Sequence, residues 1–270
     1  MIIDFHTHIF PDKIAQKTID LLAKNGQIEP FSDGTVAGLL QKMEQADVSL
    51  AVTLPVVTDP RQFDSINRFA AEINRTFENA PRRLLSFGGI HPKCEQIDQK
   101  MAFLRESGFL GVKIHPDYQG TFINDEGYVR ILECAKEYDM IVVAHAGVDG
   151  AFRDQPVRCP PHLALELIRR VKHSKLVLAH CGANEMPREA LETLCGEDVY
   201  LDTAFVLRTI GKKNFLAILQ KHGADRVLFA SDSPWSDIRG DVEIVKSFGL
   251  DQETMEKLFY KNAQQLLGMR

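Results

Sequence analysis

Eight short apolar runs, spread along the whole chain, constrain the fold more than any other feature of the sequence. They are nearly uniform in apolar character, as strands are when both of their faces are buried. They are expected as strands at 2–8, 48–54, 84–90, 109–114, 140–145, 175–180, 199–204 and 226–231. Between them, apolar residues recur every three or four positions, which indicates helices. Eight such units predict parallel pairing and closure into a (β/α)8 TIM barrel, an α/β fold.

The alternative to a barrel is an open, doubly wound sheet. That fold would place a glycine-rich turn after the first strand, but the sequence there reads His6-Thr7-His8. The 270 residues suit one large domain, and no linker or low-complexity segment divides them. We therefore predict a single domain over 1–270, with two helices, at 12–24 and 35–46, before the second strand.

Composition and charge limit the binding partners and the cellular compartment that we expect for this protein. The net charge is −5 and there is no basic run, so nucleic acid binding has no electrostatic support. No apolar run is long enough to span a bilayer, and no signal-peptide pattern is visible. The five cysteines are scattered, without a Cys-x-x-Cys, which favours free thiols in a reducing cytoplasm. We expect a cytoplasmic protein with a small-molecule substrate and no nucleic-acid or membrane partner, with homo-oligomer formation left open.

Four of the predicted strands end in a histidine or an aspartate. His6 and His8 end the first strand, and because side chains alternate along a strand they share one side. His145, His180 and Asp232 end the fifth, sixth and eighth strands. The carboxyl ends of barrel strands meet at one face, where the active sites of such barrels lie. Imidazoles and a carboxylate gathered there would form an open site for a divalent transition metal.

These residues belong to longer motifs that resemble the amidohydrolase superfamily. The resemblance is to the branch that includes aminocarboxymuconate-semialdehyde decarboxylase and many "amidohydrolase 2" proteins. The matching segments are Ile3-Asp4-Phe5-His6-Thr7-His8, Gly111-Val112-Lys113-Ile114-His115-Pro116, Val143-Ala144-His145, Leu178-Ala179-His180-Cys181-Gly182 and Leu228-Phe229-Ala230-Ser231-Asp232-Ser233-Pro234-Trp235. The resemblance implies one metal ion, usually zinc with manganese as an alternative. Its implied ligands are His6, His8, His145 and Asp232, while His180 would hydrogen-bond bound water or substrate.

Two reactions fit those roles. A divalent metal lowers the pKa of bound water from about 16 to about 7. Asp232 would accept the water proton and deliver it to a leaving group, while His180 would orient the water and stabilise negative charge. We predict a metal-dependent hydrolase that cleaves an amide, ester or lactone-type bond in a small substrate. The alternative is a metal-dependent non-oxidative decarboxylase, a carboxy-lyase, because the same groups can protonate a carbon.

Three arginines are candidates for holding a carboxylate on the substrate. Arg153 and Arg158 lie in the long loop 146–160 after the fifth strand, and Arg208 follows the seventh. Loops at this end of a barrel build the mouth of the site, and guanidinium groups hold carboxylates through paired hydrogen bonds. Simple solvation of these arginines is the alternative.

Other polar residues near the strand ends have open roles. His91 and His115, each followed by proline, are expected either to contact substrate or to form turns. Trp235 is expected to wall the pocket or to pack. Lys113 shares a face with His115, and a carbamylated Lys113 bridging two metals is the alternative to a single ion. Elsewhere we expect a structural Asp202 and solvated His162, His173 and His222.

Two other functional classes are disfavoured. A barrel that only binds a ligand would have lost a metal ligand or the acid–base group, and His6, His8 and Asp232 are all present. A metal-dependent deoxyribonuclease would need basic residues around the entrance to its active site and a glutamate on the fourth strand. The sequence has Lys113 on that strand.

Overall fold

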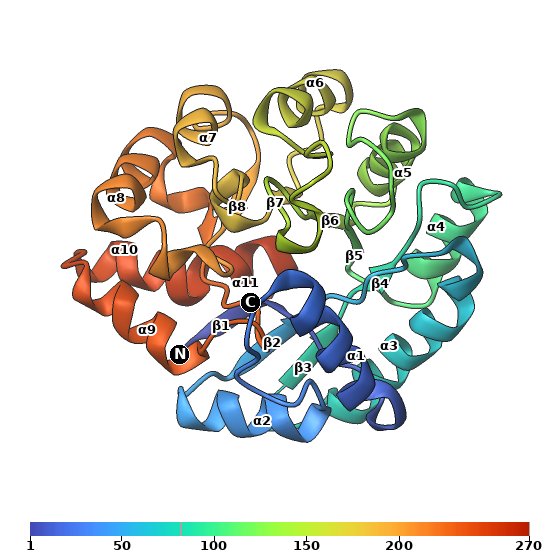
Figure 1. The fold of residues 1–270 in the computed structure, drawn as a ribbon, viewed down its shortest axis with the longest axis horizontal. Helices are drawn as coiled ribbons and strands as arrows, with labels where there is room; N and C mark the ends of the chain where they lie inside the picture. Colours follow the sequence, from blue (N-terminus) through green and yellow to red (C-terminus); the bar gives the residue numbers. More distant parts are fainter. Residues whose placement is uncertain (82, 270) are drawn as a thin grey trace.

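A computed structural model describes residues 1–81 and 83–269 and shows the (β/α)8 TIM barrel (Figure 1). All strand pairs are parallel, and strands adjacent in the sequence lie side by side in each sheet. The strands are β1 Ile3–Thr7, β2 Leu50–Thr53, β3 Arg83–Ser86, β4 Gly88–Gly89, β5 Gly111–Ile114, β6 Ile141–Ala144, β7 Leu176–Leu178, β8 Tyr200–Asp202 and β9 Val227–Leu228. Every predicted strand is present, in a shorter form.

The third predicted strand is divided into β3 and β4 at Phe87. The Phe87 N–H still donates to the Thr53 carbonyl at 3.0 Å, so the chain follows β2 up to that point. β4 then pairs with β5, with Gly88 opposite Val112. One predicted strand therefore serves two neighbours in succession, which apolar patterning does not reveal.

The barrel closes where the segment after β9 meets β1. The Phe5 N–H donates to the Phe229 carbonyl at 3.0 Å, and the Asp232 N–H donates to the His6 carbonyl at 2.8 Å. The His8 N–H adds a bond to the Ser233 carbonyl. These bonds bring the end of the eighth predicted strand beside the end of the first, so His6 and Asp232 become neighbours although they are far apart in sequence.

Helices surround the strands, and the chain goes around the barrel once (Figure 1). They are α1 Asp12–Gly26, α2 Val36–Gln45, α3 Phe63–Phe77, α4 Ile97–Glu106, α5 Glu126–Glu137, α6 Pro161–Val171, α7 Pro187–Thr193, α8 Gly211–His222, α9 Ile238–Ser247, α10 Gln252–Glu256 and α11 Asn262–Leu267. Two helices precede β2, as predicted. The last predicted helix, 252–267, consists of α10, a π-helical turn at Lys257–Lys261 and α11.

Local sequence explains why these helices begin and face as they do. At the start of α2, the Thr35 hydroxyl accepts the Gly38 N–H at 3.0 Å, which satisfies one of the free donors of the first turn. Along α3, Phe63, Ala70 and Ile73 are buried on the face toward the strands. Such an apolar stripe stabilises a helix only when it packs against another element, so the helices require the barrel.

Apolar side chains form two layers, because alternate residues of each strand point to opposite sides. On β6, Val143 belongs to the inner layer and Val142 to the layer between strands and helices. Leu266 and Leu267 of α11 join the inner layer, so this helix covers the amino-terminal end of the barrel. That end is filled with apolar side chains, which leaves the carboxyl end for polar ones.

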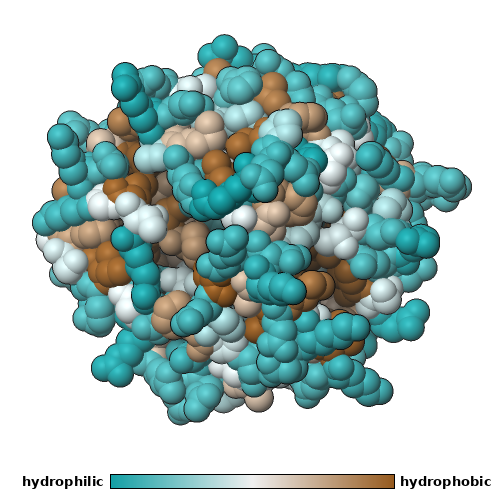
Figure 2. Space-filling model, viewed as in Figure 1, coloured by the Kyte–Doolittle hydropathy of each residue, from teal (hydrophilic) through white to brown (hydrophobic). Residues whose placement is uncertain are grey.

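The surface carries mostly polar residues. On the face shown in Figure 2, charged and polar side chains cover most of the area, and apolar residues form separate patches between them. Among the residues that the structure describes, no helix is both long enough and apolar enough to cross a membrane. All five cysteines are buried and free, as predicted.

The prediction of solvated histidines on the helices was wrong for two of three. His173 and His222 are buried, with 6% and 8% of their surface exposed, while His162 is exposed as predicted. One ring nitrogen of each buried histidine bonds a main-chain carbonyl, that of Met140 at 2.8 Å and that of Val199 at 3.0 Å. Each partner lies more than 20 residues away, so helical spacing could not reveal it.

Candidate metal centre

His6, His8 and Asp232 converge at the carboxyl end of the barrel. The Nε2 atoms of His6 and His8 are 3.2 Å apart, and Asp232 Oδ1 lies 3.4 Å from the first and 3.1 Å from the second. Donor atoms that share one ion at roughly 2.1 Å lie about 3.0 to 3.4 Å from one another. The three side chains therefore fit one divalent ion, with nitrogen and oxygen donors suited to zinc or manganese.

The other nitrogen of each of these rings is held by a fixed acceptor. His8 Nδ1 donates to the Leu54 carbonyl at 2.8 Å, and His6 Nδ1 donates to Asp202 Oδ2 at 2.9 Å. Because these bonds place the proton on Nδ1, the lone pair of each ring lies on Nε2, toward the convergence point. Asp202 thus orients His6, a contact that the sequence did not predict because the two residues are 196 positions apart.

Burial keeps the His6 imidazole neutral, which is the form that binds metal. Burial, helped by the positive charge of Lys113 and by neighbouring rings, holds the pKa of His6 well below its usual range. The pKa values of His115 and His145 are lowered in the same way. His6, His115 and His145 therefore present neutral imidazole nitrogen at the carboxyl end of the barrel.

His180 and His145 face each other beside the first three residues. His180 Nδ1 donates to the Ala204 carbonyl at 2.9 Å, so its Nε2 is an acceptor. That atom lies 2.9 Å from His145 Nδ1, which donates to it in the neutral form of the ring. His145 does not join His6, His8 and Asp232 in one tight set of ligand atoms; it groups instead with His115 and Asp149. Its role as a ligand to the first ion stays a prediction.

Lys113 points into the barrel, and only 1% of it is exposed. Its Nζ lies 3.1 Å from His6 Nε2. Burial lowers the pKa of Lys113 to about 8, so a neutral amine is accessible near neutral pH. A neutral amine is what carbamylation requires, and the bridged arrangement with two metals stays a prediction.

Two of the candidate catalytic residues have a left-handed backbone. His180 has φ of 61° and Asp232 has φ of 71°. Residues with a Cβ rarely adopt this conformation, and it is kept where the surrounding structure fixes it, often at functional sites. Gly147 shows how tightly the loops after β6 and β7 approach here, because a Cβ on it would lie 2.2 Å from the Asn184 nitrogen.

Each arginine proposed for substrate binding already has an acidic partner. Arg153 forms an exposed ion pair with Glu185, and Arg158 lies 3.5 Å from Asp117. Arg208 reaches Asp241 Oδ1 at 3.4 Å and Asp237 Oδ2 at 3.5 Å. A substrate carboxylate would therefore have to exchange with a partner, and the anchoring role stays a prediction.

The remaining candidates lie at the rim or in turns. His115 is buried and stacks on His145, with ring centres 4.1 Å apart. His91 Nδ1 accepts the Lys93 N–H at 3.0 Å, which is a turn contact. Trp235 is partly buried, and its main-chain N–H donates to the Asp232 carbonyl at 2.8 Å. Its predicted contact with substrate is not tested by these distances.

A cavity of about 300 Å³ opens next to His180. It lies between the loop after β7 and the loop after β8, and most of its lining is apolar. The lining residues are His180, Ala183, Glu185, Pro187, Val206, Thr209 and Ile210. A pocket of this size and polarity suits a small organic molecule with an apolar body, placed within reach of the His180 ring.

A TIM barrel with imidazoles and a carboxylate converging at the carboxyl ends of its strands has the arrangement of a metal-dependent barrel enzyme. The chain belongs to the amidohydrolase family, which matches residues 3–269. No curated protein matches the sequence.

Solved structures share the fold at low sequence identity. An uncharacterized TIM-barrel protein from Bordetella bronchiseptica superposes with a TM-score of 0.78 at 16% identity, covering 99% of this chain and 98% of that one. A 5-carboxyvanillate decarboxylase from Novosphingobium aromaticivorans, crystallised with manganese and a nitrobenzoic acid, gives 0.74 at 16%, covering 100% and 96%. A 2,6-dihydroxybenzoate decarboxylase from Rhizobium gives 0.71 at 15%, covering 99% and 98%.

Proposed function

We propose that this protein is a metal-dependent, non-oxidative decarboxylase of a small, unsaturated carboxylic acid. The observation that carries the proposal is the set of His6, His8 and Asp232 donor atoms within 3.4 Å of one another, close to His180 and its apolar cavity. Similarity to solved decarboxylases supports the reaction class, and zinc or manganese both suit the donors.

Each side chain of the site has a separate role in the proposed reaction. His6, His8 and Asp232, with His145 as the predicted fourth ligand, would hold a divalent ion, which would supply positive charge to stabilise negative charge on the substrate. The cavity holds the apolar body of the acid, and His180 Nε2 exchanges its contact with His145 Nδ1 for a hydrogen bond from a polar group on the acid. Asp232 transfers a proton to the carbon that bears the carboxylate, and the adjacent double bond supplies the electron pair of the new C–H bond. The C–C bond to the carboxylate then breaks, its electron pair restores the double bond, carbon dioxide leaves, and Asp232 regains a proton from water.

Hydrolysis is the second candidate, and Lys113 is the observation that favours it. Its buried Nζ lies beside His6, and its lowered pKa makes the amine available for carbamylation. A bridged pair of ions would suit activation of water for attack on an amide, ester or lactone.

One screen separates the two reactions. The metal-loaded protein is incubated in D₂O with hydroxybenzoates and enoic acids, and separately with lactones and amides. Decarboxylation predicts release of carbon dioxide and one deuterium on the carbon that lost it. Turnover of lactones or amides without carbon dioxide would contradict the proposal and support hydrolysis. Metal analysis of the same preparation identifies the ion and shows whether one or two are present.

A further inference from the structure

Two buried polar atoms beside the metal centre face each other without a hydrogen-bond partner. They are Asp117 Oδ2 and His145 Nε2, on side chains that are 2% and 7% exposed, and they lie 3.8 Å apart. Asp117 follows β5 and His145 follows β6, and these two strands are paired. Unpaired polar atoms in a protein interior are costly and rare. Two that face each other indicate that a proton stands between them in another state of the protein.

The proton of the His145 ring explains why both atoms are unpaired. His180 Nδ1 donates to the Ala204 carbonyl at 2.9 Å, so the Nε2 atom of this neutral ring can only accept. It accepts from His145 Nδ1 at 2.9 Å, which places the single proton of the neutral His145 ring on Nδ1. His145 Nε2 then turns a lone pair toward a carboxylate oxygen, so two acceptors face each other.

Metal binding by His145 would reverse this placement of the proton. Nδ1 is the nitrogen on the side of the metal centre, because it faces His180, whose ring centre lies 5.6 Å from that of His6. A ring nitrogen that binds a metal ion carries no proton, and the other nitrogen of the ring then donates to a carboxylate, a carbonyl or water. The proton would therefore stand on Nε2, opposite Asp117 Oδ2.

The surroundings hold Asp117 where it can accept that proton. Its Oδ1 faces the main-chain N–H and the guanidinium of Arg158, at 3.4 and 3.5 Å, which leaves Oδ2 toward His145. Gln119 fixes the same turn, because its side-chain amide donates to two main-chain carbonyls at 2.8 and 2.7 Å. A hydrogen bond from nitrogen to oxygen is about 2.9 Å long, so a ring movement of less than about 1 Å closes the gap.

We propose that Asp117 is a positioning residue of the metal centre and acts through His145. The inference rests on the proposed function, in which His145 is a ligand of the ion. Asp117 Oδ2 accepts the His145 Nε2–H and fixes the ring with its Nδ1 lone pair toward the ion. The same change removes the proton between the two histidines, so His180 Nε2 becomes free to accept a hydrogen bond from the substrate. Asp202 holds His6 in the corresponding way.

Zinc affinity, measured without substrate, tests this role of Asp117. Competition with a chromogenic chelator gives the dissociation constant of each full-length protein. We expect Asp117→Ala to weaken zinc binding about 100-fold and Asp117→Asn about tenfold, because the amide oxygen still accepts a hydrogen bond but carries no charge. Circular dichroism confirms that each variant is folded.

Asp241→Asn is the matched control for these variants. Asp241 is also buried at the carboxyl end of the barrel, and it also has an arginine partner, Arg208 at 3.4 Å. Its side chain is bonded to Ser236 and Arg208 rather than to a histidine. Asp241→Asn is therefore expected to keep the zinc affinity of the wild type.

The position of the His145 proton provides a second readout, which a purely structural role of Asp117 would not change. Long-range ¹H–¹⁵N NMR correlations of protein labelled at the histidine nitrogens show which ring nitrogen is protonated, and His145→Gln identifies the signals. We expect the proton on Nδ1 in the metal-free protein and on Nε2 in the zinc-loaded protein. The Nε2–H signal of the zinc-loaded protein should move upfield in Asp117→Ala, because it loses a carboxylate acceptor.

Neither readout depends on which reaction the protein catalyses. Unchanged zinc affinity in Asp117→Ala would overturn the inference and leave the proposed function standing. So would a His145 proton that stays on Nδ1 in the zinc-loaded protein. A wild type that binds no zinc or manganese would contradict the proposed function and the inference together.

Discussion

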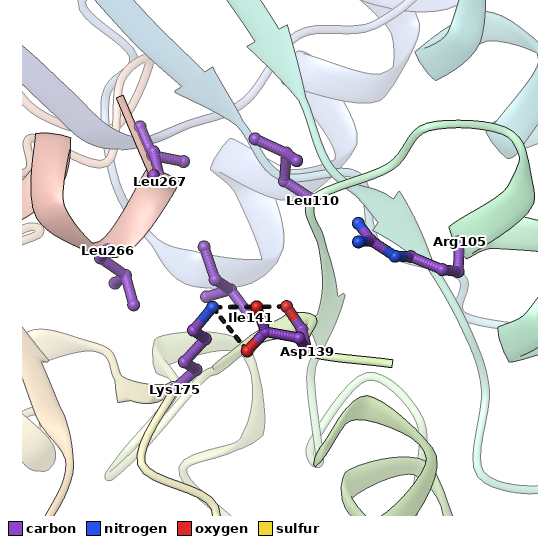
Figure 3. A pocket seen from close by; sticks show the side chains of 8 residues that line it. Arg105, Leu110, Asp139, Ile141, Lys175, Leu266 and Leu267 are labelled. Atoms are coloured by element: carbon purple, nitrogen blue, oxygen red, sulfur yellow. Dashed lines mark hydrogen bonds and ion pairs between the residues drawn. The ribbon is translucent and has the colours of Figure 1, made fainter. Parts of the chain in front are cut away.

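The two ends of the barrel both contain a cavity, and they differ in how polar groups are used. At the amino-terminal end, a cavity of about 140 Å³ is lined by residues that include Leu110, Ile141 and Leu266 (Figure 3). Its charged groups neutralise each other near solvent: Lys175 Nζ lies 2.7 Å from Asp139 Oδ1, and that aspartate is 75% exposed. None of the described residues that line this cavity is a histidine.

The carboxyl end buries its polar groups and leaves some of their atoms free. His6 is 1% exposed and Asp232 is 8% exposed, and their Nε2 and Oδ1 atoms face one another. Close by, Asp117 Oδ2 and His145 Nε2 are buried and have no hydrogen-bond partner among the described residues. Burying such groups is costly unless something binds them. In this barrel a cavity does not by itself indicate a functional site. Buried ligand atoms without a hydrogen-bond partner do indicate one.

The strongest test of this contrast is Asp232→Asn. An amide cannot carry the proton that the reaction needs, so we expect kcat/KM on the substrate found in the screen to fall about 1,000-fold or more. Metal content and thermal unfolding are measured on the same sample, which separates lost proton transfer from lost ion or lost fold. Activity within tenfold of the wild type would remove Asp232 from the mechanism.

Asp241 is a buried carboxyl group at this end of the barrel with no proposed role in metal binding. It tests whether burial alone shifts the pKa of a carboxyl group here. Burial raises its pKa from 3.8 to about 6, a difference worth roughly 3 kcal/mol. Ionisation costs the folded state more than the unfolded state, so the contribution of Asp241 to stability is full below pH 3.8 and is lost as pH rises through about 6.

Asp241→Asn should remove this loss while keeping an acceptor for the Ser236 hydroxyl. We expect the free energy of unfolding of the wild type to fall relative to the variant by up to roughly 3 kcal/mol between about pH 4 and 7. Urea unfolding of both proteins at several pH values, with chelator present, measures it. A difference that does not change with pH would show that the carboxyl titrates alike in both states.

Asp202→Asn tests the contrast between the two ends of the barrel through a residue that contacts His6. The neutral amide holds the His6 ring less firmly, and losing such a partner costs about 10- to 100-fold in metal affinity. Competition with a chromogenic chelator measures the affinity. Asp139→Asn, at the opposite end of the barrel, is the matched control and is expected to leave it unchanged. Equal affinities in Asp202→Asn and the wild type would show that His6 needs no such support.

Lys175→Met is expected to have the smallest effect. Its ion pair with Asp139 is near solvent, and such pairs contribute about 0 to 1 kcal/mol. Turnover and metal content should match the wild type, and the midpoint of urea unfolding should move little. A large loss of turnover would mean that the amino-terminal cavity takes part in function, which would break the comparison.

The sequence by itself determined the barrel and three residues of its candidate metal centre. Uniformly apolar runs specify strands buried on both faces, and parallel pairing then brings the residues after each strand to one end. Both inferences need only local patterns, so His6, His8 and Asp232 could be predicted to meet. The division of the third strand at Phe87 could not be predicted from such patterns. It depends on which adjacent strand each peptide group forms hydrogen bonds with.

Tertiary structure alone decided the partners of the side chains. The contact of Asp202 with His6 joins residues 196 positions apart, and that of Lys113 with His6 joins residues 107 apart. The left-handed backbone at His180 and the turn of the His145 ring toward Asp117 are likewise set by the packing of separate loops. Periodicity reports only which side of an element a residue occupies, whereas a contact depends on the tilt of strands and the course of loops around the barrel.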